Sequence, residues 1–361
     1  MYKHLVVLAV LFLIFSGCGN KSGTVQHTNP AVKKLDINNK TIITLTNEGL
    51  YSLPEDTTVA ERIKFPEDLS VVDFTVLKEI IYVLGINENK IKLFSGDKNS
   101  WKQLTLPAQI NTYFADKLSN VNLKKDELLK MISGNIYLKK DKSLVIFTKD
   151  ALYFESGTGW IEKKIPDVKI SVKDFADESG ISEICEIKDS IIFESFSPGE
   201  KGGIFLRCDL REANPKWESI LGNDKVTAII PDSLPDSFWY SVGEKDSLPK
   251  GKLEYYKNGN SELLSSFDDT ESVKKFSMNQ KNPVLSFYKN KEEFYILTNE
   301  SVFFYRDKYI KKILYFLDLF SGIFSDNSGN IYLYTKKEGL TKYVNTKEGY
   351  KREPVSFIYL E

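Results

Sequence analysis

A short phrase that returns along the chain constrains its fold more than any other feature of the sequence. Residues 45–51 (LTNEGLY) recur as residues 297–303 (LTNESVF) and 147–153 (FTKDALY), and residues 334–340 (YTKKEGL) repeat them with one residue added. In each copy an apolar run ends in Thr, polar residues follow, and a small residue begins a second apolar run. This pattern predicts a β-hairpin that is used several times.

Looser copies of the hairpin occupy residues 80–94, 190–206 and 237–256. The outgoing strands then begin, at a mean spacing of ~48 residues, at Gly49, Ile91, Ala151, Gly203, Gly251, Ser301 and Gly339. Such a period is typical of propeller blades with four short antiparallel strands each. We therefore expect an all-β fold, a β-propeller of seven four-stranded blades that forms one domain over residues 31–361. The apolar tail of residues 354–360 (PVSFIYL) is expected to help close the ring.

Two segments interrupt the period. One lies near residues 111–132 and includes DELLKMI at 126–132, with Asn122 as a plausible cap. We expect a short helix or loop insertion there, which either forms a lid over one face or covers a blade edge. The second is the polar segment 209–224 around Pro215.

The first residues predict export from the cytoplasm. Lys3 precedes an unbroken apolar run at 5–15, and the small residues Ser16 and Gly17 precede Cys18. This run is too short for a stable membrane-spanning helix and is typical of a signal peptide, which we place at residues 1–17. The alternatives are a secretory peptide with an incidental cysteine and an uncleaved anchor.

The order Phe15-Ser16-Gly17-Cys18 resembles the lipobox of bacterial lipoproteins, with Phe15 where an aliphatic residue is usual. The resemblance implies that Cys18 is diacylglycerylated and becomes the mature N-terminus, so that acyl chains hold the protein on a membrane. Residues 18–30 are polar and predict a flexible tether. No Asp follows Cys18, which favours the outer over the inner membrane of the bacterial envelope.

Composition narrows the function. With 49 Lys and Arg against 50 Asp and Glu, the net charge of −1 gives no electrostatic case for nucleic acid. The two histidines are His4, in the predicted signal peptide, and His27, in the predicted tether. A body without histidine has no Ser-His-Asp or Cys-His catalysis and lacks the commonest zinc ligand. We expect no cofactor and no metal.

Three groups of residues are weaker candidates for chemistry. Cys185 and Cys208 are expected on the first and third strands of one blade, which favours free thiols over a disulfide. Residues 326–330 (DNSGN) faintly resemble the start of a calcium loop but have Lys337 at the place of its last acidic ligand, so a hairpin turn is favoured. Two acidic clusters are read as solvated loops, with a glycan-cleaving site as the alternative: Asp174, Asp177 and Glu178, and Asp268, Asp269 and Glu271.

The last repeat resembles the propeller repeats of two-component regulators. That pattern has an Asp-x-x-Gly turn, an aromatic strand, then Thr-x-x-Gly-Leu and an aromatic residue; the corresponding positions are Asp326, Gly329, Tyr332, Thr335, Gly339, Leu340 and Tyr343, with one extra residue before Gly339. The first repeat keeps Thr46, Gly49, Leu50 and Tyr51. The resemblance implies a ligand- or partner-sensing propeller without its own signalling output.

Two classes of function follow from these observations. The first is a non-enzymatic, lipid-anchored propeller that binds an envelope protein, peptide or glycan as a scaffold or accessory subunit. The second is a carboxylate-dependent glycan-active enzyme that uses acids on a propeller face. A deep pocket with two carboxylates, one of raised pKa, favours the enzyme, and a shallow face with exposed aromatic side chains favours the binder.

Overall fold

The computed structural model describes residues 25–360 apart from 89, 120–135, 140–143, 149–150, 157–158, 165–179, 188–189, 197–203, 210–216, 220–224, 233, 235–236, 244–250, 268–283, 299, 308, 317, 319 and 336–338. The residues 1–24, and with them the predicted signal peptide and Cys18, lie outside this part. No helix in the described part of the chain is long and apolar enough to cross a membrane.

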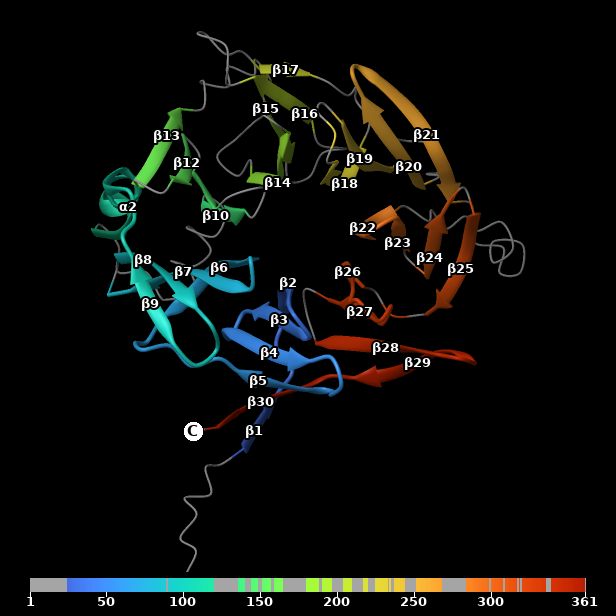
Figure 1. Ribbon diagram of the computed structural model, residues 1–361, viewed down its shortest axis with the longest axis horizontal. Coiled ribbons are helices and arrows are strands. Elements are labelled where there is room, and N and C mark those ends of the chain that lie inside the picture. Colours follow the sequence, from blue (N-terminus) through green and yellow to red (C-terminus); the bar gives the residue numbers. More distant parts are fainter. Residues whose placement is uncertain are drawn as a thin grey trace, which may run out of the picture.

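The described strands form sheets arranged in a ring, and in each four-stranded sheet the first strand lies nearest the centre (Figure 1). Six of these sheets are four-stranded blades, each made from consecutive strands. The first two blades contain β6 (Ser70–Leu77), β7 (Ile80–Asn87), β8 (Lys90–Gly96) and β9 (Trp101–Leu104), then β10 (Ile136–Lys139), β11 (Val145–Thr148), β12 (Ala151–Ser156) and β13 (Gly159–Lys164). The next two contain β14 (Gly180–Ile187), β15 (Ser190–Phe196), β16 (Ile204–Asp209) and β17 (Trp217–Ser219), then β18 (Lys225–Pro231), β19 (Ser237–Gly243), β20 (Gly251–Lys257) and β21 (Asn260–Phe267). The last two contain β22 (Val284–Asn290), β23 (Glu293–Thr298), β24 (Ser301–Arg306) and β25 (Tyr309–Tyr315), then β26 (Gly322–Ser325), β27 (Ile331–Tyr334), β28 (Leu340–Thr346) and β29 (Gly349–Pro354).

The remaining sheet, which we call the closing sheet, contains both ends of the described chain. Its strands are β1 (Val25–Thr28), β2 (Val32–Asn38), β3 (Thr41–Thr46), β4 (Leu50–Pro54), β5 (Val59–Arg62) and β30 (Ser356–Leu360). They are ordered β1-β30-β5-β4-β3-β2. The C-terminal strand β30 runs parallel to β5, and β1 pairs antiparallel with β30.

The closing sheet corrects two predictions. The all-β propeller is confirmed, but not as seven four-stranded blades: six described blades have four strands, and the closing sheet has six because β30 and β1 are added outside β5. Residues 25–28, which were expected in the flexible tether, form β1 instead, since β30 offers them an unpaired edge. His27 therefore belongs to the folded body, and the premise that this body has no histidine was wrong.

The recurring phrase is the turn between the second and third strands of a blade. Thr46 Oγ1 donates to Gly49 O at 3.1 Å and accepts from Gly49 N at 3.2 Å. Thr298 makes the same pair of bonds with Ser301, at 3.1 and 3.2 Å, and its side chain is completely buried. The repeated phrase therefore encodes the same local structure in both sheets: a buried threonine hydroxyl that forms hydrogen bonds with the backbone of a tight turn.

The hydrophobic core lies between neighbouring sheets. The last blade packs on the closing sheet through Phe324, Tyr332 and Leu340, which contact a group that includes Tyr51 and Phe357. The rings of Tyr51 and Phe357 meet edge to face with centroids 5.1 Å apart. Because Phe357 is on β30, the C-terminal strand contributes to the same core that joins the two ends of the ring.

The predicted insertion near residues 111–132 contains a helix in its described part. Helix α2 (Ala108–Ser119) begins before the expected segment, while Asn122 and residues 126–132 lie outside the described residues. Ile110 and Phe114 of α2 are completely buried in the core shared by the β6–β9 and β10–β13 blades. The described helix therefore packs on a blade junction.

Candidate functional site

A hollow lies at the outer rim, between the closing sheet and the β6–β9 blade. It consists of two adjoining pockets of about 450 and 250 Å³ that share Arg62, Ile63 and Lys64. We call it the seam groove. Further lining residues come from β4 (Ser52), from β30 (Ile358) and from the β8–β9 turn (Lys98 and Asn99).

The segment that follows β5 is held firmly beneath the groove. Ile63 N donates to Leu50 O at 2.8 Å, so the segment continues the pairing of β5 with β4. Trp101 Nε1 of β9 donates to Lys64 O at 3.1 Å, and the Trp101 ring lies 4.8 Å from the ring of Phe65. These contacts fix the backbone that carries Arg62 and Lys64 although both side chains are exposed.

The opposite wall is a turn organised by Asp97. Its Oδ1 accepts from Asn99 N at 2.7 Å and from Ser100 N at 2.8 Å. These two backbone N–H donors hold the pKa of the Asp97 carboxyl below its usual value. The turn therefore presents Lys98 and Asn99 from a fixed backbone.

Most of the charged residues that line the larger pocket of the seam groove are basic. Arg62, Lys64 and Lys98 line it together with one acidic residue, Glu61. Neither Lys64 nor Lys98 forms an ion pair within the described part of the chain. In the smaller pocket, Glu67 pairs with Lys92 at 2.5 Å. The groove is thus suited to an anionic group, for which guanidinium and ammonium groups are the usual protein donors.

The polar groups near the ring centre serve to join sheets. Lys34 Nζ of β2 lies 2.8 Å from Asp73 Oδ1 of β6 and donates to Phe74 O at 2.6 Å. Asp36 Oδ2 accepts from Val76 N at 3.1 Å. Each of these contacts crosses from the closing sheet to the β6–β9 blade, which explains why charged residues occupy inner strands.

Asp326 is fully buried, and its carboxylate accepts four hydrogen bonds. Its oxygens accept from Ser328 N, Asn330 N, Asn330 Nδ2 and the Tyr332 hydroxyl, at 2.9, 2.9, 2.7 and 3.0 Å. Burial raises the pKa of Tyr332, and the adjacent Asp326 carboxylate raises it further. The prediction of a hairpin turn at residues 326–330 is confirmed, and the carboxylate organises that turn.

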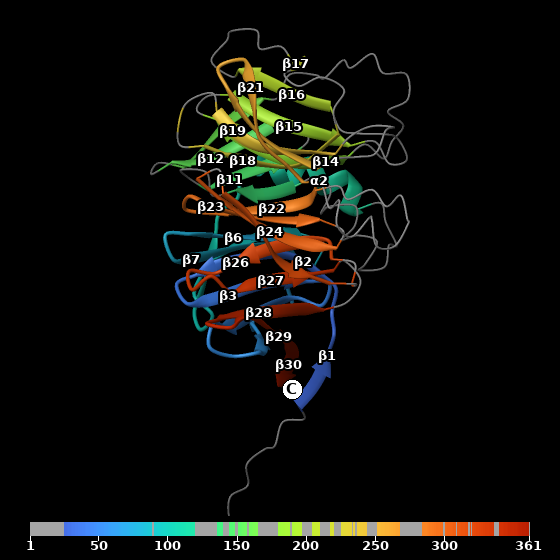
Figure 2. The same cartoon turned by 90° about the vertical axis from the view of Figure 1, so that its right-hand side faces the viewer.

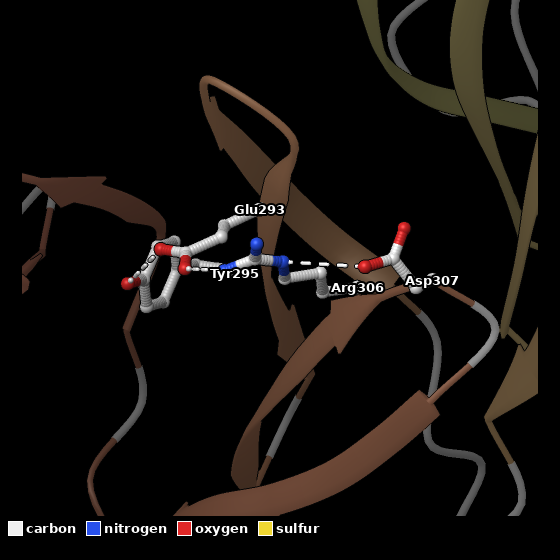
Figure 3. A network of polar contacts seen from close by, with 4 residues as sticks. All are labelled: Glu293, Tyr295, Arg306 and Asp307. Atoms are coloured by element: carbon white, nitrogen blue, oxygen red, sulfur yellow. Dashed lines mark hydrogen bonds and ion pairs between the residues drawn. The ribbon is translucent and has the colours of Figure 1, made fainter.

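A second carboxylate network lies on the β22–β25 blade (Figure 3). Glu293 Oε1 lies 3.1 Å from Arg306 Nη1, and Glu293 Oε2 accepts from the Tyr295 hydroxyl at 3.2 Å. Asp307 contacts the other side of the guanidinium, 3.3 Å from Arg306 Nε. These contacts connect β23, β24 and the turn after β24, so we assign the network a structural role.

Glu55 comes nearest to what the enzyme hypothesis requires. Burial raises its pKa, the Asp326 carboxylate raises it further, and Lys40 and Lys342 oppose the shift. Glu55 lines neither pocket of the seam groove. The six acidic residues proposed from the sequence, in the clusters at 174–178 and 268–271, lie outside the described residues.

The cysteines occupy the predicted strands. Cys185 is on β14 opposite Ile192, and Cys208 is on β16 opposite Ile191. Strand β15 lies between them, which places the two backbones roughly 9–10 Å apart. This register favours free thiols over a disulfide. Among the residues that the structure describes, no three His, Cys, Asp or Glu side chains gather as a metal site requires.

The sequence did not point to the seam groove. Its cations come from β5, the connection after it and the turn of another blade, and each is an ordinary exposed residue when read alone. Lys64 and Lys98 line one hollow only because the closing sheet and the β6–β9 blade lie side by side. The position of Lys98 directly after Asp97, in a turn, was the one local signal available.

No known family model matches the sequence, and no curated protein matches it. Solved structures resemble its fold. The extracellular domain of BT4673 from B. thetaiotaomicron, described as a one-component or hybrid two-component system, aligns with a TM-score of 0.51 and 13% identity over 90% of this chain. This chain spans 40% of that structure's length.

Two further structures give the same result. YCF48 from Cyanidioschyzon merolae has a TM-score of 0.51 and 12% identity over 88% of this chain and 98% of its own. The β-propeller domain of the Trilobed protease from Pyrococcus furiosus has a TM-score of 0.51 and 10% identity over 91% and 98%. The fold is a β-propeller. At these identities the similarity shows the fold and nothing about activity.

Proposed function

We propose that this chain is a lipid-anchored, extracytoplasmic β-propeller that binds an envelope protein, peptide or glycan as a scaffold and catalyses no reaction. The observation that carries the proposal is the place where the chain ends leave the ring. Both β1 and β30 lie at the outer edge of the closing sheet, so neither strand covers the faces of the ring (Figure 1). Tethered through β1, the propeller keeps the turns of both faces open to partners.

Two other observations support the location. The Phe15-Ser16-Gly17-Cys18 sequence resembles a lipobox, and β1 begins shortly after it. BT4673, whose extracellular domain shares the fold, is a bacterial protein with its propeller outside the cell. We infer an outer-membrane anchor on Cys18.

The anchor is tested by metabolic labelling with an alkyne-bearing fatty acid. We expect label on the wild-type protein, none on Cys18→Ala, and full label on the matched control Cys185→Ala. Equal labelling of the Cys18 variant, or no labelling of the wild type, would overturn the proposed anchor.

Partner binding is tested by photo-crosslinking in cells. A photoreactive residue at Ile80 or Lys90 probes the two opposite ends of β7, and one at Tyr309 probes the outer rim; all three positions are exposed. We expect a discrete adduct with an envelope component from one face and none from Tyr309. The absence of adducts from both faces, or release of reducing ends from envelope glycans by the purified protein, would contradict a non-catalytic binder.

A further inference from the structure

The seam groove lies at the part of the rim where the chain ends leave the ring. Ile358 of β30 lines its larger pocket, and all four residues of β1 pair with β30. In Figure 2 the β1–β30 pair lies at one end of the ring, beside the marked C-terminus. The groove and the start of the described chain therefore belong to the same edge of the molecule.

The length of chain between Cys18 and β1 limits the distance of this edge from a membrane. Fully extended, the chain from Cys18 to Val25 spans at most ~25 Å, at ~3.5 Å per residue. An acylated Cys18 would thus hold the closing sheet near the bilayer surface and turn the groove's side of the rim toward it. This step rests on the proposed anchor.

The groove has the chemistry of an anion site at that edge. Arg62, Lys64 and Lys98 present one guanidinium and two ammonium groups to a hollow of about 450 Å³, with Glu61 as its acidic member. A guanidinium binds a phosphate with two parallel N–H donors, and ammonium groups add point charges. Val59, on the neighbouring β5 and 39% exposed, adds an apolar side chain suited to the membrane interface.

We propose that the seam groove binds the phosphate headgroup of an anionic phospholipid in the membrane that carries the anchor. Lys64 and Lys98 hold the phosphate from opposite walls, and Arg62 adds positive charge beside them. The contact would orient the ring edge-on to the bilayer, so that both faces point along the membrane surface. An acidic peptide shares the charge but not the adjacency to the anchor, so the lipid is the favoured occupant.

The test is a calorimetric titration of the purified mature protein in neutral detergent with short-chain phosphatidylglycerol below its micellar concentration. Parallel arms use short-chain phosphatidylcholine, inorganic phosphate and an oligoglutamate peptide. The test variant is Lys64→Gln/Lys98→Gln, and the matched control is Lys257→Gln/Lys311→Gln, which removes two exposed lysines of distant strands.

We expect phosphatidylglycerol to bind in preference to the other three ligands. A lysine near an anionic lipid surface is worth ~1 kcal/mol, or about 5-fold, so the double variant should weaken binding about 30-fold and the control should not change it. Absence of binding, an equal loss in both variants, or preference for inorganic phosphate or the peptide would overturn the proposal. The titration does not depend on acylation, so its failure and a failure of the Cys18 labelling are distinguishable.

Discussion

Replacement of Asp326 tests whether the last repeat is organised by its buried carboxylate. In Asp326→Ala, the backbone N–H and side-chain amide of Asn330 and the hydroxyl of Tyr332 lose their acceptor. Asn330 is 8% exposed and Tyr332 is fully buried, so water replaces the carboxylate poorly. Each buried neutral donor left without an acceptor costs ~1–3 kcal/mol, and removal of the buried charge offsets part of the sum, so we expect a net loss of ~3–5 kcal/mol.

Asp326→Asn separates charge from shape. The amide oxygen can still accept from Ser328 N and Asn330 N, whereas its NH₂ group faces the Asn330 amide. We expect a loss of about 2–3 kcal/mol, between that of the alanine variant and the wild type. The matched control is Asp97→Ala. Asp97 also accepts from two backbone N–H groups of its own turn, but it is exposed, so water can replace the lost acceptor.

The assay is urea unfolding followed by far-ultraviolet circular dichroism at pH 7, with slope and midpoint compared across the three variants. The expected order of destabilisation is Asp326→Ala, Asp326→Asn, then Asp97→Ala. If Asp326→Ala unfolds at the same urea concentration as Asp97→Ala, the buried network does not hold the blade and the reasoning is refuted.

Three further predictions concern the buried side chains of Tyr332, Thr298 and Phe357. Burial and Asp326 raise the pKa of Tyr332, so its contribution to the free energy of unfolding is complete below about pH 10 and is lost as the pH rises toward the raised pKa, at up to ~1.4 kcal/mol per pH unit. In unfolding measured at alkaline pH, Tyr332→Phe should be less stable than the wild type at neutral pH but should lose stability less steeply as the pH rises. Parallel curves would contradict this. Thr298→Val leaves the buried turn to Ser301 without its two hydroxyl bonds and should cost ~1–3 kcal/mol in urea, whereas an unchanged midpoint would show that the hydroxyl is dispensable. Phe357→Ala removes a fully buried ring packed on Tyr51 and should cost ~3–5 kcal/mol; a midpoint equal to that of the wild type would show that β30 does not contribute to closure.

Local chemistry explains what could be predicted. The hairpin at Thr46 and Gly49 is specified by neighbours within four residues, and the expected starts of the third strands agree with the observed ones to within about one residue, the usual uncertainty of strand ends. The turn at Asp326 was predictable for the same reason, since its carboxylate accepts from residues of its own turn.

Contacts between distant segments explain what was missed. Residues 25–28 (VQHT) are too short a run to indicate a strand by themselves; they pair because β30, from the other end of the chain, lies beside them. Helix α2 begins before the expected segment at 111–132, because Ile110 and Phe114, four residues apart, form a face that is buried against two blades. The seam groove depends on two blades at once, so no single segment predicts it.

The parallel pairing of β30 with β5 has a consequence for the order of folding. It joins the first sheet of the chain to the last strand, and Lys342 donates a hydrogen bond to Thr57 O across 285 residues of sequence. Contacts between residues so far apart in the sequence form late, because the intervening blades must fold first to bring the two ends together. Until β30 arrives, β5 keeps an unpaired edge that another chain can occupy. The sheet at the beginning of the chain is therefore the last to be completed, and damage to the final residues should appear first as aggregation through that edge.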